Sequence, residues 1–386
     1  MSEKFFDTFV DFGSSKIRIG VFDKNLPKIN FFSEKNCVSN FNLDKINLNN
    51  SNKVIEELIQ ISEKKIGIHI NSVNLMIDTP DLFSIDLSIK KNLEGKKVND
   101  DDIKYLLQEA RQLVQNNNFN KKIIHIIIEK IVFDNEIFYS IPEEKPKCNY
   151  LTLEIKFICF SNVIIDQLIN HLKENHISIK NIFCSSYVKS LNYNQLFENY
   201  DKKVFLDIGF RKSCLTIFDK NRLILLNTIP VGGHHITKDI SQVLKISEED
   251  SENIKKSLNQ SETIFSNDSN EEFISNFEIR NKLKENISLD LLKKVIYARI
   301  DEILNLSFSN INFSFLINNK NKCILVFTGE GSKILDKNSI FLEKKFNFFN
   351  EMNFFEENTK VICQSGYNFC NKKNSHEVNI VSKKPK

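Results

Sequence analysis

Residues 203–209 read Lys-Val-Phe-Leu-Asp-Ile-Gly, an apolar run that ends in Asp-x-Gly, and a second apolar run follows at Ser213–Phe218. The chain opens with the same pattern. Phe6–Val10 leads into Asp11-Phe12-Gly13-Ser14-Ser15, after which apolar residues alternate up to Phe22. Both stretches predict a strand, a tight turn and a second strand. Their repetition far apart in the sequence indicates an internal duplication.

These two turns have the chemistry of a phosphate cradle. Backbone N–H groups can point into a tight turn between strands and bind an anion, and glycine allows a close approach. Ser14 and Ser15 can donate to phosphate oxygens, and Asp11 and Asp207 can orient a Mg²⁺ that keeps its waters. A single Asp-x-Gly hairpin is more often an ordinary turn.

A third glycine turn follows a third apolar strand. Thr328-Gly329-Glu330-Gly331-Ser332 comes directly after Cys323–Phe327 and is expected to open a helix, whose N-terminus would face a ligand. As a lone Gly-x-Gly it would be weak evidence. Three glycine turns at strand ends, in this order, predict a nucleotide site.

The order of the turns resembles that of the actin-like ATPases, and further residues narrow the resemblance to the FtsA family of cell-division proteins. Pro-Val-Gly-Gly-His-His-Ile-Thr-Lys-Asp-Ile at 230–240 is similar to that family's run after the second phosphate turn. Glu252-Asn253-Ile254-Lys255 resembles its Glu-x-x-Lys helix. His125 and Asp134 match the ends of a strand in its extra domain. The resemblance covers residues 5–370.

The resemblance implies an α/β, actin-like two-lobed fold built from duplicated ATPase subdomains, with an α+β insert typical of FtsA-like proteins. The expected boundaries are residues 1–72 and 161–200 for the first subdomain, 73–160 for the insert, 201–240 and 307–370 for the second subdomain, 241–306 for a small partner-binding subdomain, and 371–386 for a disordered basic tail.

It also implies ATP and Mg²⁺ as ligands, with the metal held indirectly through Asp11 and Asp207. The expected nucleotide-binding residues are Asp11, Gly13, Ser14, Ser15, Lys16, Asp207, Gly209, Lys212, Gly232, Gly233, Glu252, Lys255, Gly329, Gly331 and Ser332. Phe210-Arg211-Lys212 stands where the family has Gly-Gly-Thr, and Glu330 replaces a glycine. We therefore expect weak or absent hydrolysis, with Arg211 or Lys212 as a substitute cation for the phosphates.

A predicted helix at Ile287–Leu306 carries the expected partner site. Leu292, Val295, Ile296, Ile300 and Ile303 share one face, and Arg299 lies within this stripe, so it is expected to pair with a buried acid or a carbonyl. By resemblance, Lys293, Lys294 and Arg299 are candidates to bind the C-terminal peptide of FtsZ; equally, the lysines form an ordinary solvated face.

The implied function is a division adaptor at the cytoplasmic side of the cell membrane. It would self-associate into filaments, bind FtsZ, and bind other divisome proteins through the insert. The tail after Asn371 lacks the amphipathic helix with which FtsA-like proteins attach to the membrane, so peripheral membrane association has no visible anchor.

Composition limits the other classes of function. Fifty-three basic residues against 50 acidic ones leave a net charge of +3, which predicts no nucleic-acid partner. Eight cysteines without a CxxC pair favour reduced thiols in the cytoplasm, and neither a signal peptide nor a membrane span is expected. His234-His235 lacks a third metal ligand, and no nucleophilic triad stands out.

Two alternatives remain on the same fold. A phosphotransferase or chaperone-type ATPase would need an intact second phosphate turn and a base, which Phe210-Arg211-Lys212 disfavours. A pilus-assembly adaptor has the same insert and needs no terminal amphipathic helix.

Overall fold

A computed structural model describes most of the chain, which divides into two compact units. The residues described are 6–23, 30–37, 48–79, 81–257, 265–266, 273–274, 289–309, 311, 322–335, 342, 345–371 and 377–378. Unit 1 comprises 1–196, 221–226 and 358–386, and unit 2 comprises 197–220 and 227–357. No helix within these described ranges is both long and apolar enough to cross a membrane.

Unit 1 is built on a five-stranded sheet with the order β3-β2-β1-β4-β9. The strands are β1 (Phe6–Phe12), β2 (Lys16–Asp23), β3 (Asn30–Asn36), β4 (Ser72–Ile77) and β9 (Ser178–Cys184). β1, β2 and β3 pair antiparallel, whereas β4 runs parallel to β1 and β9 runs parallel to β4. The carboxyl ends of β1, β4 and β9 therefore meet at one edge of the sheet.

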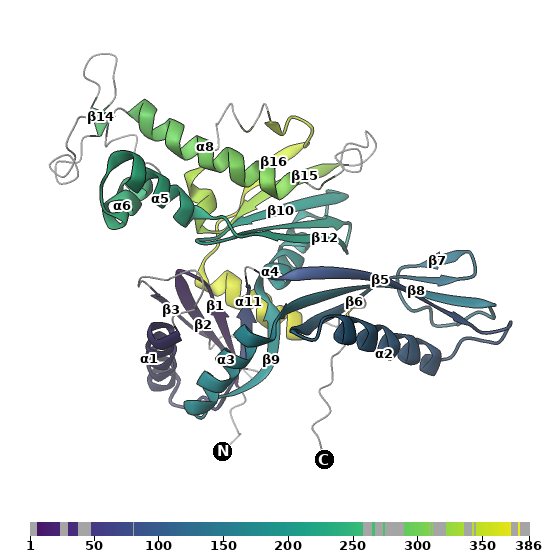
Figure 1. The fold of residues 1–386 in the computed structure, drawn as a ribbon. Helices are drawn as coiled ribbons and strands as arrows, with labels where there is room; N and C mark the ends of the chain where they lie inside the picture. The colour runs from purple at the N-terminus through teal and green to yellow at the C-terminus, as the bar shows by residue number, and fades with distance from the viewer. Residues whose placement is uncertain are drawn as a thin grey trace. The chain divides into compact units, whose positions relative to one another are not determined.

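Helices pack against this sheet (Figure 1). They are α1 (Leu48–Ile66), α3 (Asn162–Glu174), α4 (Ser185–Asn194), followed by the 3₁₀ turn η1 (Gln195–Phe197), and α11 (Thr359–Asn371). α11 packs across β1 and β2, and two glycines make this possible. A Cβ on Gly20 would lie 2.5 Å from the Cβ of Cys363, and one on Gly366 would lie 2.6 Å from the sulfur of Met76.

The insert is a separate four-stranded sheet in unit 1, with the order β5-β8-β6-β7. Its elements are β5 (Phe83–Asn92), α2 (Asp100–Asn117), β6 (Lys121–Phe133), β7 (Glu136–Phe138) and β8 (Tyr150–Ser161). α2 lies along the sheet (Figure 1) and buries Leu106 and Ala110 against Leu153 and Ile155. A capping box starts the helix, because Asn99 and Asp102 each accept a hydrogen bond from the other's backbone N–H.

Unit 2 repeats the sheet order of unit 1. Its sheet runs β12-β11-β10-β15-β16, with β15 parallel to β10 and β16 parallel to β15. The strands are β10 (Lys202–Ile208), β11 (Ser213–Asp219), β12 (Arg222–Ile229), β15 (Cys323–Thr328) and β16 (Glu351–Phe354). The antiparallel hairpin β10–β11 corresponds to β1–β2. This repetition confirms the duplicated, actin-like fold expected from the sequence.

Three helices pack together beside this sheet: α5 (Gly233–Leu244), α6 (Glu248–Ser257) and α8 (Leu289–Phe308). A short hairpin, β13 (Phe265–Ser266) and β14 (Phe273–Ile274), and a 3₁₀ turn, η2 (Glu330–Ile334), complete the described elements. The predicted apolar stripe on α8 is confirmed, since Leu292, Ile296, Ile300 and Ile303 are buried.

A helix follows Gly329, as expected, but it is the five-residue 3₁₀ helix η2 (Glu330–Ile334), because the N–H and hydroxyl of Ser332 both donate to the carbonyl of Gly329. Glu377 and Val378, within the tail predicted to be disordered, are ordered against the insert. The rest of the predicted tail beyond Asn371 lies outside the described residues.

The close approach of α11 to the first sheet gives a test of the fold. We expect Gly366→Val to lower the free energy of unfolding by about 1–3 kcal/mol, because its side chain would overlap the buried ring of Phe9 and the sulfur of Met76. Lys360→Val, at an exposed position of the same helix, is the control. Urea unfolding followed by circular dichroism measures both; equal midpoints would contradict this packing.

Candidate functional site

The first glycine turn is a tight hairpin with an acidic residue at its base. The N–H of Gly13 donates to the carbonyl of Lys16 at 3.0 Å, and a Cβ on Gly13 would lie 2.7 Å from that oxygen. Asp11 is buried, and the hairpin register places it opposite Arg18. Ser14 and Ser15 occupy the tip and are half-buried.

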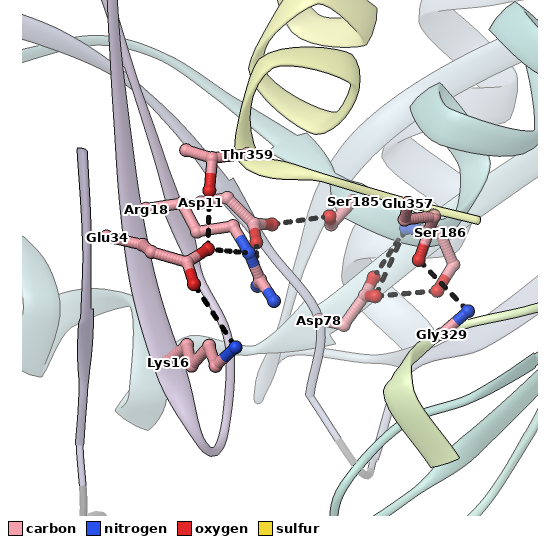
Figure 2. Close-up of polar contacts among 10 residues, drawn as sticks. All are labelled: Asp11, Lys16, Arg18, Glu34, Asp78, Ser185, Ser186, Gly329, Glu357 and Thr359. Carbon is pink, nitrogen blue, oxygen red and sulfur yellow. Dashed lines mark hydrogen bonds and ion pairs between the residues drawn. The ribbon is translucent and has the colours of Figure 1, made fainter. Parts of the chain in front are cut away.

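Asp11 is held on both oxygens (Figure 2). Its Oδ1 accepts from the hydroxyl of Ser185 at 2.7 Å, and its Oδ2 faces the Arg18 guanidinium at 3.1 Å. Ser185 is the first residue of α4, directly after β9. Asp11 is therefore fixed in an ionic setting, which suits a carboxylate that orients the water shell of a metal.

Glu34 of β3 forms ion pairs with the cationic side chains next to this turn. It pairs with Lys16 at 3.2 Å and with Arg18 at 3.4 Å, and it accepts a hydrogen bond from Thr359. Burial acts to raise the pKa of Glu34, but the bonds from Thr359 and Lys16 and the charges of Lys16 and Arg18 outweigh it and lower the pKa. In this structure Lys16 thus points to Glu34.

A second acid, Asp78, lies at the same sheet edge after β4. Its carboxylate accepts from the N–H of Ser186 at 3.1 Å and from the Ser186 hydroxyl at 2.6 Å, and the thiol of Cys184 lies 3.3 Å away (Figure 2). These bonds cap the start of α4. Asp78 was missed from sequence, although an acid directly after an apolar strand, as at Asp11, was a usable signal.

The second glycine turn, in unit 2, has the same backbone as the first. The N–H of Gly209 donates to the carbonyl of Lys212 at 2.9 Å, and a Cβ on Gly209 would lie 2.9 Å from that oxygen. Asp207, at the end of β10, is opposite Thr328 of the parallel neighbour β15. The predicted strand-turn-strand pattern is therefore confirmed at both places.

The start of α5 closes this second turn from one side. Gly233 donates to the carbonyl of Gly209 at 2.9 Å, and His234 donates to that of Phe210 at 2.6 Å. A Cβ on Gly232 would lie 2.5 Å from the Gly209 carbonyl oxygen, so only glycine fits there. The first amides of the helix are bound to the turn.

The third glycine turn packs onto the second. Gly329 has a φ of +82°, and a Cβ there would lie 2.3 Å from an oxygen of Asp207. A Cβ on Gly331 would lie 2.7 Å from the carbonyl oxygen of Ile208. The N–H of Gly329 donates to Glu357 at 3.0 Å (Figure 2), an acid that was not predicted. The Ser332 hydroxyl is bound within its own turn.

Glu252 and Lys255 of α6 lie beside the start of α5, next to the second and third glycine turns. Lys255 is buried and donates to the carbonyl of Gly233 at 2.9 Å, to Thr237 at 2.7 Å and to Glu252 at 2.5 Å. A Cβ on Gly233 would lie 3.5 Å from the Cα of Gly331 and 3.8 Å from the Lys255 amino group. The structure thus brings together the predicted residues of unit 2, listed from the chain start as Asp207, Gly209, Lys212, Gly232, Gly233, Glu252, Lys255, Gly329, Gly331 and Ser332.

Burial acts unequally on the two members of this pair: at Lys255 it outweighs the charge and hydrogen bond of Glu252 and lowers the pKa of the amino group, whereas at Glu252 it is outweighed. Burial acts to raise the pKa of Glu252, yet the charge and hydrogen bond of Lys255 and the bond from Thr237 outweigh it and lower that pKa. His234 is different, because its ring lies 4.7 Å from that of Phe210 and burial lowers its pKa to about 4. Among the described residues no group of His, Cys, Asp and Glu forms a direct metal site.

The low pKa of His234 gives a test by pH. An unfolded chain binds a proton at this histidine below about pH 6.5 while the folded chain stays neutral to about pH 4, so stability falls as the pH falls through that range. Between pH 7 and pH 5 the loss is about 2 kcal/mol. His234→Phe keeps a ring against Phe210 but has no proton to bind. We expect its free energy of unfolding to fall by about 2 kcal/mol less than that of the wild type between pH 7 and pH 5.

The control is His69→Phe, because the side chain of His69 is 76% exposed. Urea unfolding at the two pH values measures the difference. If His234→Phe and the wild type had the same pH dependence, His234 would not be held neutral by burial.

Comparison with known proteins finds sequence similarity between this chain and the cell division protein FtsA. A family model described as cell division protein FtsA matches residues 204–339, the stretch that holds all three glycine segments of unit 2. The chain is 24% identical over 241 residues to the cell division protein FtsA of Bacillus subtilis, covering 62% of this chain and 52% of that protein. It is 23% identical over 312 residues to that of Streptococcus pneumoniae, covering 79% and 66%.

These matches span about half to two thirds of the length of the curated relatives. Among solved structures, a PilM-PilN type IV pilus biogenesis complex aligns with a TM-score of 0.61 at 9% identity, covering 92% of this chain and 89% of that one. At this identity the likeness concerns the fold alone. The resemblance predicted from the sequence is thus confirmed: the chain is similar in sequence to cell division proteins FtsA and has the actin-like fold.

Proposed function

We propose that the chain is a cell-division adaptor of the FtsA type that binds ATP with Mg²⁺, self-associates, and links FtsZ filaments to the division machinery at the cytoplasmic face of the membrane. The observation that carries the proposal is the packing of the 207–209, 232–233 and 329–331 segments around Asp207, within the stretch that the FtsA family model matches. The insert at 73–160 would bind other divisome proteins.

The residues present fit a magnesium nucleotide. Glycines let the second and third turns and the start of α5 pack closely on one another, and Lys255 and Glu252 lie beside them, where they would meet the nucleoside. Asp207 would hold the metal through its waters, and Asp11 is proposed for the same task within unit 1. Ser14 and Ser15 would donate to phosphate oxygens. The bound metal would neutralise phosphate charge.

Nucleotide binding is proposed without efficient hydrolysis. Gly233 and His234 already donate to the second turn, so these amides of α5 are engaged before any phosphate arrives. Phe210 packs on His234 where the family has small residues. The nucleotide would act as a structural switch through unequal affinity for two arrangements of the protein. Turnover on the order of 1 per second or more would favour an enzyme instead.

Asp207 tests the metal-linked site. We expect Asp207→Asn to weaken binding of Mg-ATP about tenfold or more while leaving the weaker binding of ATP in EDTA unchanged, because only the metal depends on the carboxylate charge. Glu249→Gln, at an exposed acid of α6, is the control. Thermal-shift titration measures affinity, since 100 times the Kd should stabilise by about 2.7 kcal/mol. No shift with ATP in the wild type would reject the nucleotide proposal.

The FtsZ site is proposed on the outer face of α8. Lys293 and Lys294 are exposed there and could meet an acidic peptide. Arg299 has a structural task, because it forms two bonds to Asp239 of α5, at 2.6 and 2.8 Å, and pairs with Glu302. The bond to Asp239 is the largest cause of a raised pKa at Arg299. Arg299 would therefore support the peptide site from beneath.

Charge reversal separates a peptide site from a solvated face. We expect Lys293→Glu with Lys294→Glu to weaken binding of an FtsZ C-terminal peptide at least fivefold, and less so at high salt, because exposed charges are screened. Lys322→Glu, exposed on the same unit, is the control. Fluorescence anisotropy with a labelled peptide measures the change. Equal affinities for all variants would leave α8 without a role in recognition.

A second candidate on the same fold is a pilus-assembly adaptor; the fold alignment with a PilM-PilN type IV pilus biogenesis complex is compatible with it. Such a protein would bind a different partner and would need neither FtsZ nor the lysines of α8. Genomic neighbours separate the two candidates, and so does a pull-down with the FtsZ peptide in the presence of Mg-ATP.

A further inference from the structure

We propose that the edge of β6 that faces away from β8, beside His125, binds an extended segment as an added strand, and that this segment needs an acidic residue followed by an aliphatic one. The segment that binds there is Glu377-Val378 of the same chain. β6 pairs along one side with β8. On its other side, β7 pairs only with Ile131–Phe133. Within the described residues, Ile126 and Ile127 of β6 contact the C-terminal segment on that side.

The segment docks as a short antiparallel strand. Glu377 forms an antiparallel bridge with Ile127, and the N–H of Val378 donates to the carbonyl of Ile126 at 2.9 Å. The Val378 side chain packs against the apolar core of the insert. Main-chain bonds of this kind supply affinity, and side-chain contacts supply the choice of sequence.

His125 accounts for the requirement for an acidic residue at position 377. Its side chain is 1% exposed, and its Nε2 accepts a hydrogen bond from the N–H of Cys184 at 2.9 Å. That bond requires the proton to be on Nδ1, which faces Glu377 Oε1 at 2.5 Å. Without Glu377, a buried N–H would lose its acceptor, which is unfavourable.

The surroundings of His125 join the insert to the rest of unit 1. The ring lies 6.1 Å from Phe183 of β9, 4.9 Å from Tyr187 of α4 and 5.6 Å from Phe369 of α11. The hydroxyl of Tyr187 also donates to Glu377 at 3.4 Å. Glu377 thus closes a cluster formed by four elements, and docking of the segment holds the insert in place.

Hydrogen exchange of the full chain tests the site. We expect amide exchange at Val378, whose N–H donates to Ile126, to be at least tenfold slower than in an unstructured peptide, and Glu377→Ala to abolish this protection. Glu356→Ala, an exposed acid in the chain just before α11, should preserve it. Unprotected amides in the wild type, or full protection in Glu377→Ala, would overturn the proposal.

A disulfide tests whether the occupant is the same chain. Opposed residues of an antiparallel pair are close enough for a disulfide. We expect Ile126→Cys with Val378→Cys, an opposed pair that leaves Glu377 in place, to oxidise to a cross-linked monomer in a Cys370→Ser background, which removes the one exposed thiol among the described cysteines. Ile137→Cys with Val378→Cys, on exposed β7, is the control and should not react. A cross-linked dimer would assign the site to a second copy and contradict the proposal; equal reaction of both pairs would also contradict it.

Discussion

Both units depend on one backbone constraint, the hydrogen bond that closes a hairpin directly after an acid. Gly13 donates to Lys16 at 3.0 Å, and Gly209 donates to Lys212 at 2.9 Å. Any other residue at either glycine would press its Cβ against the closing carbonyl. The hairpin fixes the register of the central strand, and parallel pairing then brings further strand ends to the same edge. Asp78 and Ser185 arrive beside Asp11 in this way, and Gly329 beside Asp207.

The two glycine turns have the same backbone hydrogen bond but differ in the charged groups around them. Around Asp11 the turn is rich in charge, with Arg18 and Lys16 shared between Asp11 and Glu34. At the second turn the printed contacts are between backbone groups, since the first amides of α5 donate to the carbonyls of Gly209 and Phe210. Divergence after duplication thus changed side chains and contacts while retaining the sheet order.

Local patterns were sufficient for the hairpins and for α8, because each depends on residues close together in the sequence. Glu34 and Glu357 could not be assigned, because their positions follow from pairing between distant strands; Asp78 could have been found, because it directly follows an apolar strand. The helix expected after Gly329 is present in a 3₁₀ form for a local reason: Ser332 bonds back to Gly329 and tightens the turn. The domain boundaries and the nucleotide and partner residues stay predictions, although the structure brings many of those residues together.

α5 connects the candidate nucleotide residues to the candidate partner helix by a continuous set of contacts. Its first amides bind the second glycine turn, Thr237 in its second turn contacts Lys255 and Glu252 of α6, and Asp239 holds Arg299 of α8. The ion pair to Arg299 has two bonds in a fixed planar geometry, so a shift of α5 would carry α8 with it. A ligand that displaced the Gly209–Phe210 carbonyls would act on the first amides of α5, and the lysines on α8 would move as part of the same packed set. This contact path is the physical basis on which a nucleotide could govern the affinity for a peptide, because both sites would bias the position of one helix.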